Sequence, residues 1–534
     1  MKKLITKIAV AAGMVVAMGT TGSAQNNLGA DCGCPSVSSR PTKNFSSYVD
    51  VDGNLLANLY LSCDTTYILN DKVWVGAGKS ITIAPGTVIK GTPTGIGIQQ
   101  NSLVIMRGGK IYASGTSTCP IVFTSTNDPV NGTYPIGNRA EWGGIQVLGS
   151  AQLARIGGVA MIGGGTTANG EWVMEGLNSD PRSIFGGGST PNNNDNSGVL
   201  RYISIRHAGG ATAANVELNG LSLGAVGSGT TIENIEVLSN DDDAIEWWGG
   251  TVNCKYINFM FLNDDGYDID MDYDGKLQFL FGVKAPAAVA PGGESGFEWD
   301  GDEGSSTWFG GYTSAVSTIK SHPVVYNATI IGNGSNVSAT GSGFTTGNPF
   351  GISFKADAEG EIYNSIFTGF RGGMNLQGGS DSSYVNWVNN LVKVQCNHWV
   401  ACTFPASNTN VQFTGADSTK FFSENNVNTN SITGFDQVFN ISGTTNVVSD
   451  NIDVVPTSNL ATTCSAPNDG FFTPAAYRGA FEAGKKPWLN KWAYTSVINV
   501  IPGLSPCPTD LNSDGQTNTS DFLIFVAQFN LSCN

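Results

Sequence analysis

The segment near the end of the chain carries a regular set of oxygen ligands. Between Asp510 and Asp521, oxygen-bearing residues stand at positions 1, 3, 5, 7, 9 and 12 of a loop, and Gly515 stands at position 6, where the backbone must turn sharply. Such a loop suits Ca²⁺, because this hard cation takes roughly six to eight converging oxygens. The predicted ligands are Asp510, Asn512, Asp514, the carbonyl oxygen of Gln516, Asn518 and Asp521. An Asp- and Asn-rich turn without metal is the alternative.

A second group of acidic residues lies near the middle of the chain. Asn240-Asp241-Asp242 recurs 23 residues later as Asn263-Asp264-Asp265. Further acids follow these motifs: Asp243, Glu246, Asp268, Asp270, Asp272, Asp274, Glu298, Asp300, Asp302 and Glu303. Paired carboxylates supply the acid and the base of glycoside hydrolysis, which makes Asp242, Asp264 and Asp265 candidate catalytic residues.

The same acids have two non-catalytic interpretations. Crowded like charges repel one another unless protons or a cation neutralise them. A candidate second cation site therefore consists of Asp241, Asp242, Asp243, Asp264 and Asp265. Acidic corners with a purely structural role are the other interpretation.

Few basic residues accompany these acids. The chain has three His, and His207, which follows the predicted strand Tyr202-Ile203-Ser204-Ile205, is expected at a surface or a corner. A polysaccharide lyase needs a Lys or Arg as base, and Lys355 and Arg371 are available without a context that singles them out. We therefore favour a non-enzymatic protein, with a polysaccharide lyase or a glycosidase as the alternative.

Tryptophans accompany the acidic clusters. They are Trp247, Trp248, Trp299 and Trp308. Exposed rings beside carboxylates are typical of sugar-binding surfaces, because a ring stacks on a pyranose face while polar groups bond its hydroxyls. The alternative is that these rings fill the core or cover the end of a coil.

Short β-branched runs separated by Gly, Asn and Asp recur from residue 67 onward. Examples are Val73-Trp74-Val75, Ile81-Thr82-Ile83 and Leu103-Val104-Ile105, and Ile81 to Leu103 is a step of 22 residues. One coil of this size cannot bury its own apolar face, whereas stacked coils share a continuous core. We therefore predict an all-β solenoid, a parallel β-helix, with Asn, Asp and Gly at corners that require left-handed backbone.

The start of the chain and its charge indicate the compartment. Basic residues, an apolar stretch from Ile8 to Met18 and small residues up to Ala24 follow the order of a secretory signal peptide, which we place at 1–24. A secreted, extracellular or cell-surface protein without a membrane span is expected. The formal net charge of −16 argues against nucleic acid as a partner.

The ten cysteines fit an oxidising compartment. Their spacing predicts the disulfides Cys396–Cys402 and Cys507–Cys533. The pairing of Cys32, Cys34, Cys63, Cys119, Cys254 and Cys464 stays open. A zinc site is the alternative to disulfides, although no His lies near Cys32 and Cys34.

Several short motifs of the chain resemble those of a family of bacterial secreted proteins with a pectin-lyase-like fold, which is frequent in the Bacteroidetes. They include Ile83-Ala84-Pro85-Gly86-Thr87, Glu141-Trp142-Gly143-Gly144-Ile145 and Gly470-Phe471-Phe472-Thr473-Pro474. The resemblance implies a right-handed parallel β-helix, and it implies little about activity because most members are uncharacterised. The calcium loop, with Asp521 instead of Glu at position 12, resembles the repeat of dockerin modules, which carry two such repeats where this chain has one.

The sequence thus predicts four regions and one function. A signal peptide at 1–24 precedes an N-terminal cap at 25–64, a β-helix body at 65–505 with insertions near 150–198 and 285–320, and a calcium-binding tail at 506–534. We expect a glycan-binding, matrix-binding or structural surface protein that uses Ca²⁺. A polysaccharide and, through the tail, a surface or cohesin-like protein are the expected partners, and a purely structural, adhesive fibre is a further alternative.

Overall fold

A computed structural model describes most of the chain between residues 28 and 501. It also describes Thr519 and Leu523. It omits the segments 96–99, 214–215, 286–294, 302–320, 333–349, 379–381, 403–414, 437–451 and 498–499 and the single positions 154, 156, 178, 371 and 401. The predicted signal peptide, the predicted calcium loop and the Cys507–Cys533 pair lie outside the described residues.

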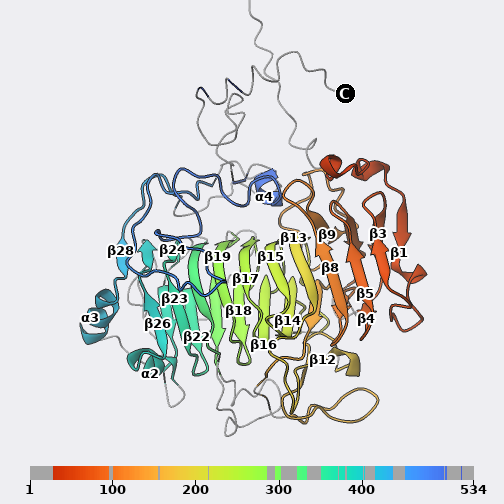
Figure 1. Cartoon of the computed structure of the whole chain (residues 1–534), viewed down its shortest axis with the longest axis horizontal. Helices are drawn as coiled ribbons and strands as arrows, with labels where there is room; N and C mark the ends of the chain where they lie inside the picture. Colours follow the sequence, from red (N-terminus) through yellow and green to blue (C-terminus); the bar gives the residue numbers. More distant parts are fainter. Residues whose placement is uncertain are drawn as a thin grey trace, which may run out of the picture.

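The described strands stack as a right-handed parallel β-helix, seen from the side in Figure 1. A 17-stranded sheet folds around two faces of the solenoid, and a 9-stranded sheet forms the third face. This confirms the predicted fold. Among the described residues, no helix combines the length and the apolar composition that crossing a bilayer requires.

The large sheet has two faces because its long strands bend in the middle. These long strands are β13 (Gly198–Arg206), β15 (Thr231–Leu238), β17 (Cys254–Met260), β19 (Lys276–Val283) and β21 (Val324–Ile331). The first face also contains β2 (Leu59–Leu61), β5 (Ser80–Ile83), β8 (Lys110–Ser114), β23 (Gly360–Tyr363) and β26 (Val392–Gln395). The second face also contains β1 (Thr42–Asn44), β3 (Thr66–Leu69), β6 (Val88–Gly91), β9 (Ile121–Ser125), β24 (Ile366–Thr368), β27 (His398–Val400) and β28 (Val427–Thr429).

The third face is the smaller parallel sheet. Its strands, in stacking order, are β4 (Val73–Val75), β7 (Leu103–Ile105), β10 (Ile145–Leu148), β14 (Leu221–Val226), β16 (Ile245–Gly250), β18 (Tyr267–Asp270), β20 (Phe297–Asp300), β22 (Phe350–Lys355) and β25 (Gly372–Leu376). Outside the solenoid lie the short antiparallel pair β11 (Trp172–Val173) and β12 (Ile184–Phe185) and the helices α2 (Ser383–Val388), α3 (Gly415–Ser423) and α4 (Tyr494–Val497).

The corner between the first and second faces has left-handed backbone in successive coils. The corner residues have φ between 50° and 61°, and they are Tyr202, Asn234, Tyr256, Phe279, Asn327, Asn364 and Cys396. Asn tolerates this conformation because its short polar side chain bonds locally, whereas an aromatic residue pays a steric penalty. The Tyr256 and Phe279 rings stack at 5.1 Å, which offsets part of that penalty. The prediction of Asn at the corners was therefore only partly right.

Aliphatic side chains from successive coils meet inside the solenoid. Ile203, Ile235, Ile257 and Leu280 are paired in register from β13 to β19, and all are fully buried. Burying each such side chain contributes about 1.5–3 kcal/mol. Because the register repeats from coil to coil, residues at outward positions also line up in columns along the solenoid.

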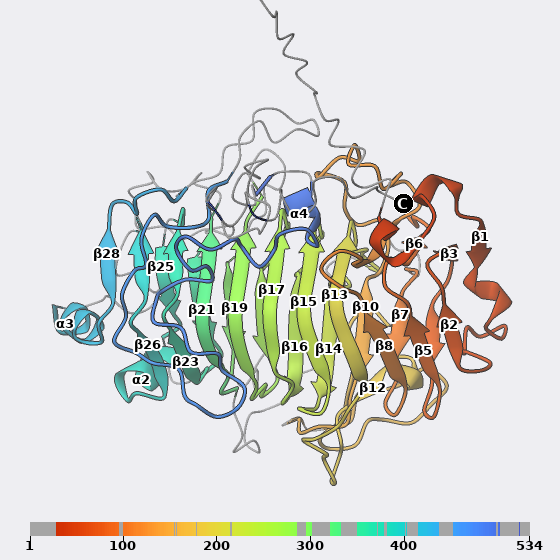
Figure 2. The same ribbon diagram turned by 45° about the horizontal axis from the view of Figure 1, so that its top comes forward.

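Two segments cover outer surfaces of the solenoid. The insertion that contains β11 and β12 packs Trp172, Met174 and Phe185 on outward residues of the third face, such as Trp248. The C-terminal strap, residues 452–497, crosses the large sheet and accepts a hydrogen bond of 2.8 Å from Gln278 at its Thr473 carbonyl oxygen. Figure 2 shows the strap in blue in front of the coils from β13 to β26, whereas β2, β5 and β8 are free of it.

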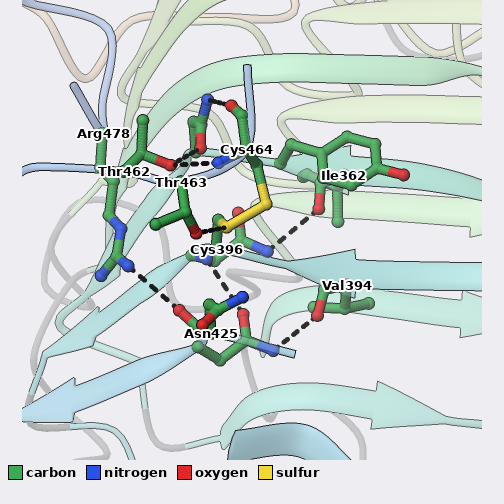
Figure 3. The surroundings of a disulfide bond; sticks show 12 residues. Ile362, Val394, Cys396, Asn425, Thr462, Thr463, Cys464 and Arg478 are labelled. Carbon is green, nitrogen blue, oxygen red and sulfur yellow. Dashed lines mark hydrogen bonds between the residues drawn. A yellow bond between two sulfur atoms is a disulfide. The ribbon is translucent and has the colours of Figure 1, made fainter. Parts of the chain in front are cut away.

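A disulfide fixes the strap to the solenoid, and it corrects one prediction. Cys396 is bonded to Cys464 in the strap and not to Cys402, as Figure 3 shows for Cys396 and Cys464. The reason is orientation: Cys396 lies at the left-handed corner that faces the strap, whereas Cys402 is buried in the solenoid core with a free thiol. Two further disulfides, Cys32–Cys119 and Cys34–Cys63, attach the N-terminal region to the first coils.

Candidate functional site

A pocket of about 370 Å³ opens on the third face of the solenoid. The described residues that line it are acidic apart from one Asn, and none of these is Cys, His, Lys or Arg. It lies beside the insertion that covers the earlier coils of this face, because Glu175 of that insertion forms part of the wall together with Glu217.

Two consecutive turns supply one side of the pocket. Asp241–Asp243 follow β15, and Asn263–Asp265 follow β17 one coil later. The two turns are joined by a hydrogen bond of 2.8 Å from the Asp265 amide to the Asp243 carboxylate. The Asn240 side chain donates to the Asp243 carbonyl oxygen at 2.7 Å and holds the first turn closed. The recurring Asn-Asp-Asp motif therefore places equivalent carboxylates in neighbouring coils.

A column of three outward carboxylates supplies the other side. Glu246 on β16 is paired in register with Asp268 on β18, and Asp268 is paired with Glu298 on β20. Neighbouring strands are about 4.8 Å apart, so the three side chains follow one another at that interval. They point outward because the residues that alternate with them, such as Trp247, fill the interior.

The carboxylates form two triads that share Asp243. Oxygens of Asp242, Asp243 and Asp264 lie within 4.8 Å of one another, and so do oxygens of Asp243, Glu246 and Asp268. Oxygen-only donor sets of this kind suit hard cations such as Ca²⁺, whereas zinc prefers His and Cys. The spacing is narrower than the roughly 6.5–9.5 Å between the two carboxyl groups of an inverting glycosidase. The triads therefore fit a cation better than they fit inverting hydrolysis.

Burial and mutual repulsion raise the pKa values of these acids. Burial is the largest cause for the raised pKa of Asp242, Asp243 and Glu246, and the neighbouring carboxylates add to it. Burial also raises the pKa of Asp265, although Lys284 and Lys355 act in the opposite direction. The pocket therefore favours either protons or a cation over a set of bare negative charges.

Basic residues lie behind and beside the acids. Arg139 forms an ion pair of 2.5 Å with Asp241. The buried Lys284 amine donates to the Asp264 carbonyl oxygen, and Lys355 pairs with Glu298. These three contacts neutralise part of the negative charge at the rim of the pocket.

The structure brings together the five acids of the sequence-based candidate site. Asp241, Asp242, Asp243, Asp264 and Asp265 all line the pocket. Glu246, Asp268 and Glu298, noted among the neighbouring acids, join them, whereas Asp270 lies 3.6 Å from Arg155 instead. Glu175 and Glu217 were not predicted, because nothing in their local sequence resembles the Asn-Asp-Asp motif.

The three described tryptophans near the acids are buried and offer no ring for stacking on a sugar. Trp247 and Trp299 are fully buried in the solenoid core, which confirms the interpretation as core residues for these two. Trp248 points outward and is buried under the insertion, and Trp308 lies outside the described residues. His207 lies at a left-handed corner, as expected, but it is buried and bonds the Asn138 carbonyl oxygen at 2.6 Å.

Comparison with known proteins agrees with the architecture. A family model described as the pectate-lyase-like beta helix domain matches residues 53–442. No curated protein matches the chain.

Proposed function

Because the chain belongs to the pectate-lyase-like β-helix family, we propose that it is a secreted protein that binds an acidic polysaccharide through a divalent cation in the acid-lined pocket, without cleaving it. The observation that carries this proposal is the pair of carboxylate triads that share Asp243. The family supports a polysaccharide as the partner, and the donor atoms support Ca²⁺ as the cation.

The charge of the pocket explains why a cation is needed. A uronic acid carboxylate that approaches these acids alone is repelled. A bound Ca²⁺ removes the repulsion, and because it takes roughly six to eight oxygens, it has positions left for carboxylate and hydroxyl oxygens of a sugar. Binding of the polysaccharide at the pocket should therefore require the cation.

We further propose that the C-terminal tail binds a second Ca²⁺ and attaches the protein to a surface or to a cohesin-like partner. The six oxygen ligands between Asp510 and Asp521 support this role, as does their resemblance to a dockerin repeat. Calcium binding would then stabilise the folded tail, because the unfolded chain does not hold the ligands in one place.

Calorimetric titration of the full chain tests both cation sites. We expect two bound Ca²⁺ per chain, one of which is lost in the Asp242→Asn/Asp264→Asn variant and the other in the Asp510→Asn/Asp514→Asn variant. The exposed Glu482 offers a matched control, since Glu482→Gln removes one negative charge at a residue that belongs to neither set of proposed ligands. The calcium-dependent part of the binding of a polyuronate oligomer, measured as the difference between calcium and chelator, should disappear in the pocket variant only. A calcium-dependent part that survives the pocket substitutions at full strength would refute the cation-bridged mode.

A calcium-dependent polysaccharide lyase is the second candidate. The specific observation that favours it is Lys355, which pairs with Glu298 at the edge of the pocket and is of the residue type that serves as the base of a polysaccharide lyase. Elimination creates an unsaturated sugar that absorbs in the ultraviolet, so the reaction can be followed on polyuronate with calcium and with chelator. Product that forms with the wild type and not with Lys355→Gln would establish the lyase and overturn the proposal of a binding protein.

A further inference from the structure

Two exposed tyrosines lie in one column on the first face of the solenoid. Tyr60 on β2 is paired in register with Thr82 on β5, and Thr82 is paired with Tyr112 on β8. The exposed fractions of Tyr60 and Tyr112 are 64% and 43%. Two steps of the strand spacing separate the rings by about 9.6 Å along the axis of the solenoid. The small Thr82 side chain between them leaves the space over both rings open.

Tyrosines on this face are not exposed elsewhere along the described coils. Tyr326 and Tyr363 stack on each other at 4.7 Å farther along the same face, and Phe472 of the C-terminal strap covers Tyr326 at 4.9 Å. Both of these rings are buried, with exposed fractions of 5% and 8%. The strap does not cover β2, β5 and β8, so the first coils present their rings to the surroundings (Figure 2).

The residues around the two rings are polar and basic. The remaining outward positions of β5 and β8 are Ser80, Lys110 and Ser114. The half-buried Lys79 immediately precedes β5, and its amine donates to the Leu56 carbonyl oxygen at 2.9 Å. None of these outward positions carries an acid, although the whole chain has a net charge of −16. Lys110 is two residues from Tyr112 on the same strand face, about 7 Å away, so its amine can reach a carboxylate of a sugar stacked on that ring. This charge favours an anionic partner.

We propose that the column of Tyr60, Thr82 and Tyr112 is a binding surface for a linear, equatorially linked acidic polysaccharide that lies along the solenoid axis. Alternate pyranose units stack on the two rings, since their separation is close to the length of a disaccharide in such an extended chain. The Ser80 and Ser114 hydroxyls bond sugar hydroxyls, and Lys110 pairs with a carboxylate. No cation is required. An aliphatic protein partner fits less well, because the outward positions between the rings carry hydroxyls and an amine instead of apolar side chains.

The proposal is independent of the acid-lined pocket, so the two can be tested separately. The probe is an oligomer of equatorially linked uronic acid, titrated against the full chain in chelator, which removes cation-bridged binding. We expect the wild type and the Asp242→Asn/Asp264→Asn pocket variant to bind equally. The Tyr60→Ala/Tyr112→Ala variant should lose at least tenfold in affinity, which corresponds to about 1.4 kcal/mol. If the wild type does not bind the oligomer in chelator, the proposal of a tyrosine surface is refuted, whereas the proposal for the acid-lined pocket is not affected.

Three further variants separate stacking from charge and from general damage. Phe422 in α3 is 48% exposed and lies near the opposite end of the solenoid, so Phe422→Ala is the aromatic control and should bind normally. Lys110→Gln should weaken binding of the uronic acid oligomer and reduce its salt dependence, whereas the exposed control Lys485→Gln should change neither. Thermal unfolding of each variant establishes that it is folded. If the wild type dimerises in solution and Tyr60→Ala/Tyr112→Ala does not, the surface is an interface between two copies of the chain and the glycan proposal fails.

Discussion

Glu246 and Asp268 lie directly opposite each other on β16 and β18, with their carboxylates directed into one pocket. Like charges at such paired positions destabilise a sheet. Asp268 is also opposite Glu298, so the repulsion extends over three coils. This repulsion lowers the stability of the fold, and it is the cost that we expect of the proposed cation site.

Removing the central charge of this column should stabilise the protein without calcium. We expect Asp268→Asn to raise the free energy of unfolding in chelator by about 1 kcal/mol, because both neighbouring pairs lose their repulsion. The same variant should gain less stability from added calcium than the wild type. Chemical denaturation with and without calcium measures both effects, and Glu482→Gln is the control. A variant that is less stable than the wild type in chelator would contradict this explanation of the pocket.

The raised pKa values of the pocket acids predict an unusual pH dependence. In the unfolded chain these acids ionise near their ordinary values of 3.8 for Asp and 4.5 for Glu, whereas in the folded protein Asp242, Asp243 and Glu246 keep their protons to higher pH. The folded state therefore binds more protons above pH 4.5, and its stability falls as the pH rises through the folded pKa values. Without calcium, the wild type should lose more stability from pH 5 toward neutral pH than a variant with Asn and Gln at these three positions.

Calcium should reduce this difference, because a cation removes the advantage of the protonated form. Thermal unfolding across the pH range, in chelator and in calcium, measures the effect. Parallel pH profiles for the wild type and the triple variant in chelator would mean that the pocket acids titrate normally.

Glu236 should be essential for docking of α4. Its buried carboxylate accepts hydrogen bonds from the backbone amides of Tyr494, at 2.8 Å, and Thr495, at 3.3 Å. It also accepts from Ser204 at 2.6 Å, and Arg206, which donates to Ser204, lies over the Tyr494 ring. Glu236→Ala leaves these donors buried without their acceptor, so we expect a loss of about 3 kcal/mol. Hydrogen exchange around residues 480–497 should increase, and Glu236→Gln, which keeps one acceptor oxygen, should show a smaller change.

The Cys396–Cys464 disulfide should hold the strap on the sheet. The Cys396→Ser/Cys464→Ser variant is expected to lose about 2–4 kcal/mol of stability and to be cut faster by proteases within the strap. Asn364 still contacts Cys464 and Arg478 still contacts Asn425, at 2.6 and 3.0 Å, so the strap should loosen locally while the coils stay folded (Figure 3). Cys402→Ala is the control, and peptide mapping should find its thiol free in the wild type. A mapped Cys396–Cys402 bridge would contradict the observed pairing.

The fold could be predicted from the sequence because short strands with alternating inward and outward residues repeat along the chain. Runs such as Ile81-Thr82-Ile83 alternate inward and outward residues, and each run lies beside a run of the next coil. The step varies, however, since Ile81 is paired with Ile111 and not with Leu103, which is paired with Val73. The Asn-Asp-Asp motif occurs in two consecutive coils, and this repetition brings Asp242 and Asp264 together. Where the signal is periodic, sequence position translates directly into spatial position.

Contacts made by irregular segments could not be predicted in this way. Glu175 reaches the pocket through an insertion with no repeat, and the partner of Cys396 is in a strap that returns across the sheet from a distant part of the chain. Spacing along the chain favoured Cys402, but its side chain points into the core. The tryptophans were ambiguous for a related reason, because a Trp beside an acid in a strand lies on the opposite side of the sheet from it.

The left-handed corner at Tyr202, Asn234, Tyr256 and Phe279 has a consequence for the evolution of the protein. Insertion or deletion of one residue within a coil would exchange inward and outward positions up to the next corner. Gain or loss of a complete coil keeps every inward position inward, because the new junction connects two corners of the same kind. Gene duplication in whole-coil units can therefore lengthen or shorten such a molecule without redesign of its interior. Each coil gained or lost changes the length of the outer surfaces along the solenoid axis by about 4.8 Å. Related chains therefore match ligands of different length through the number of their coils.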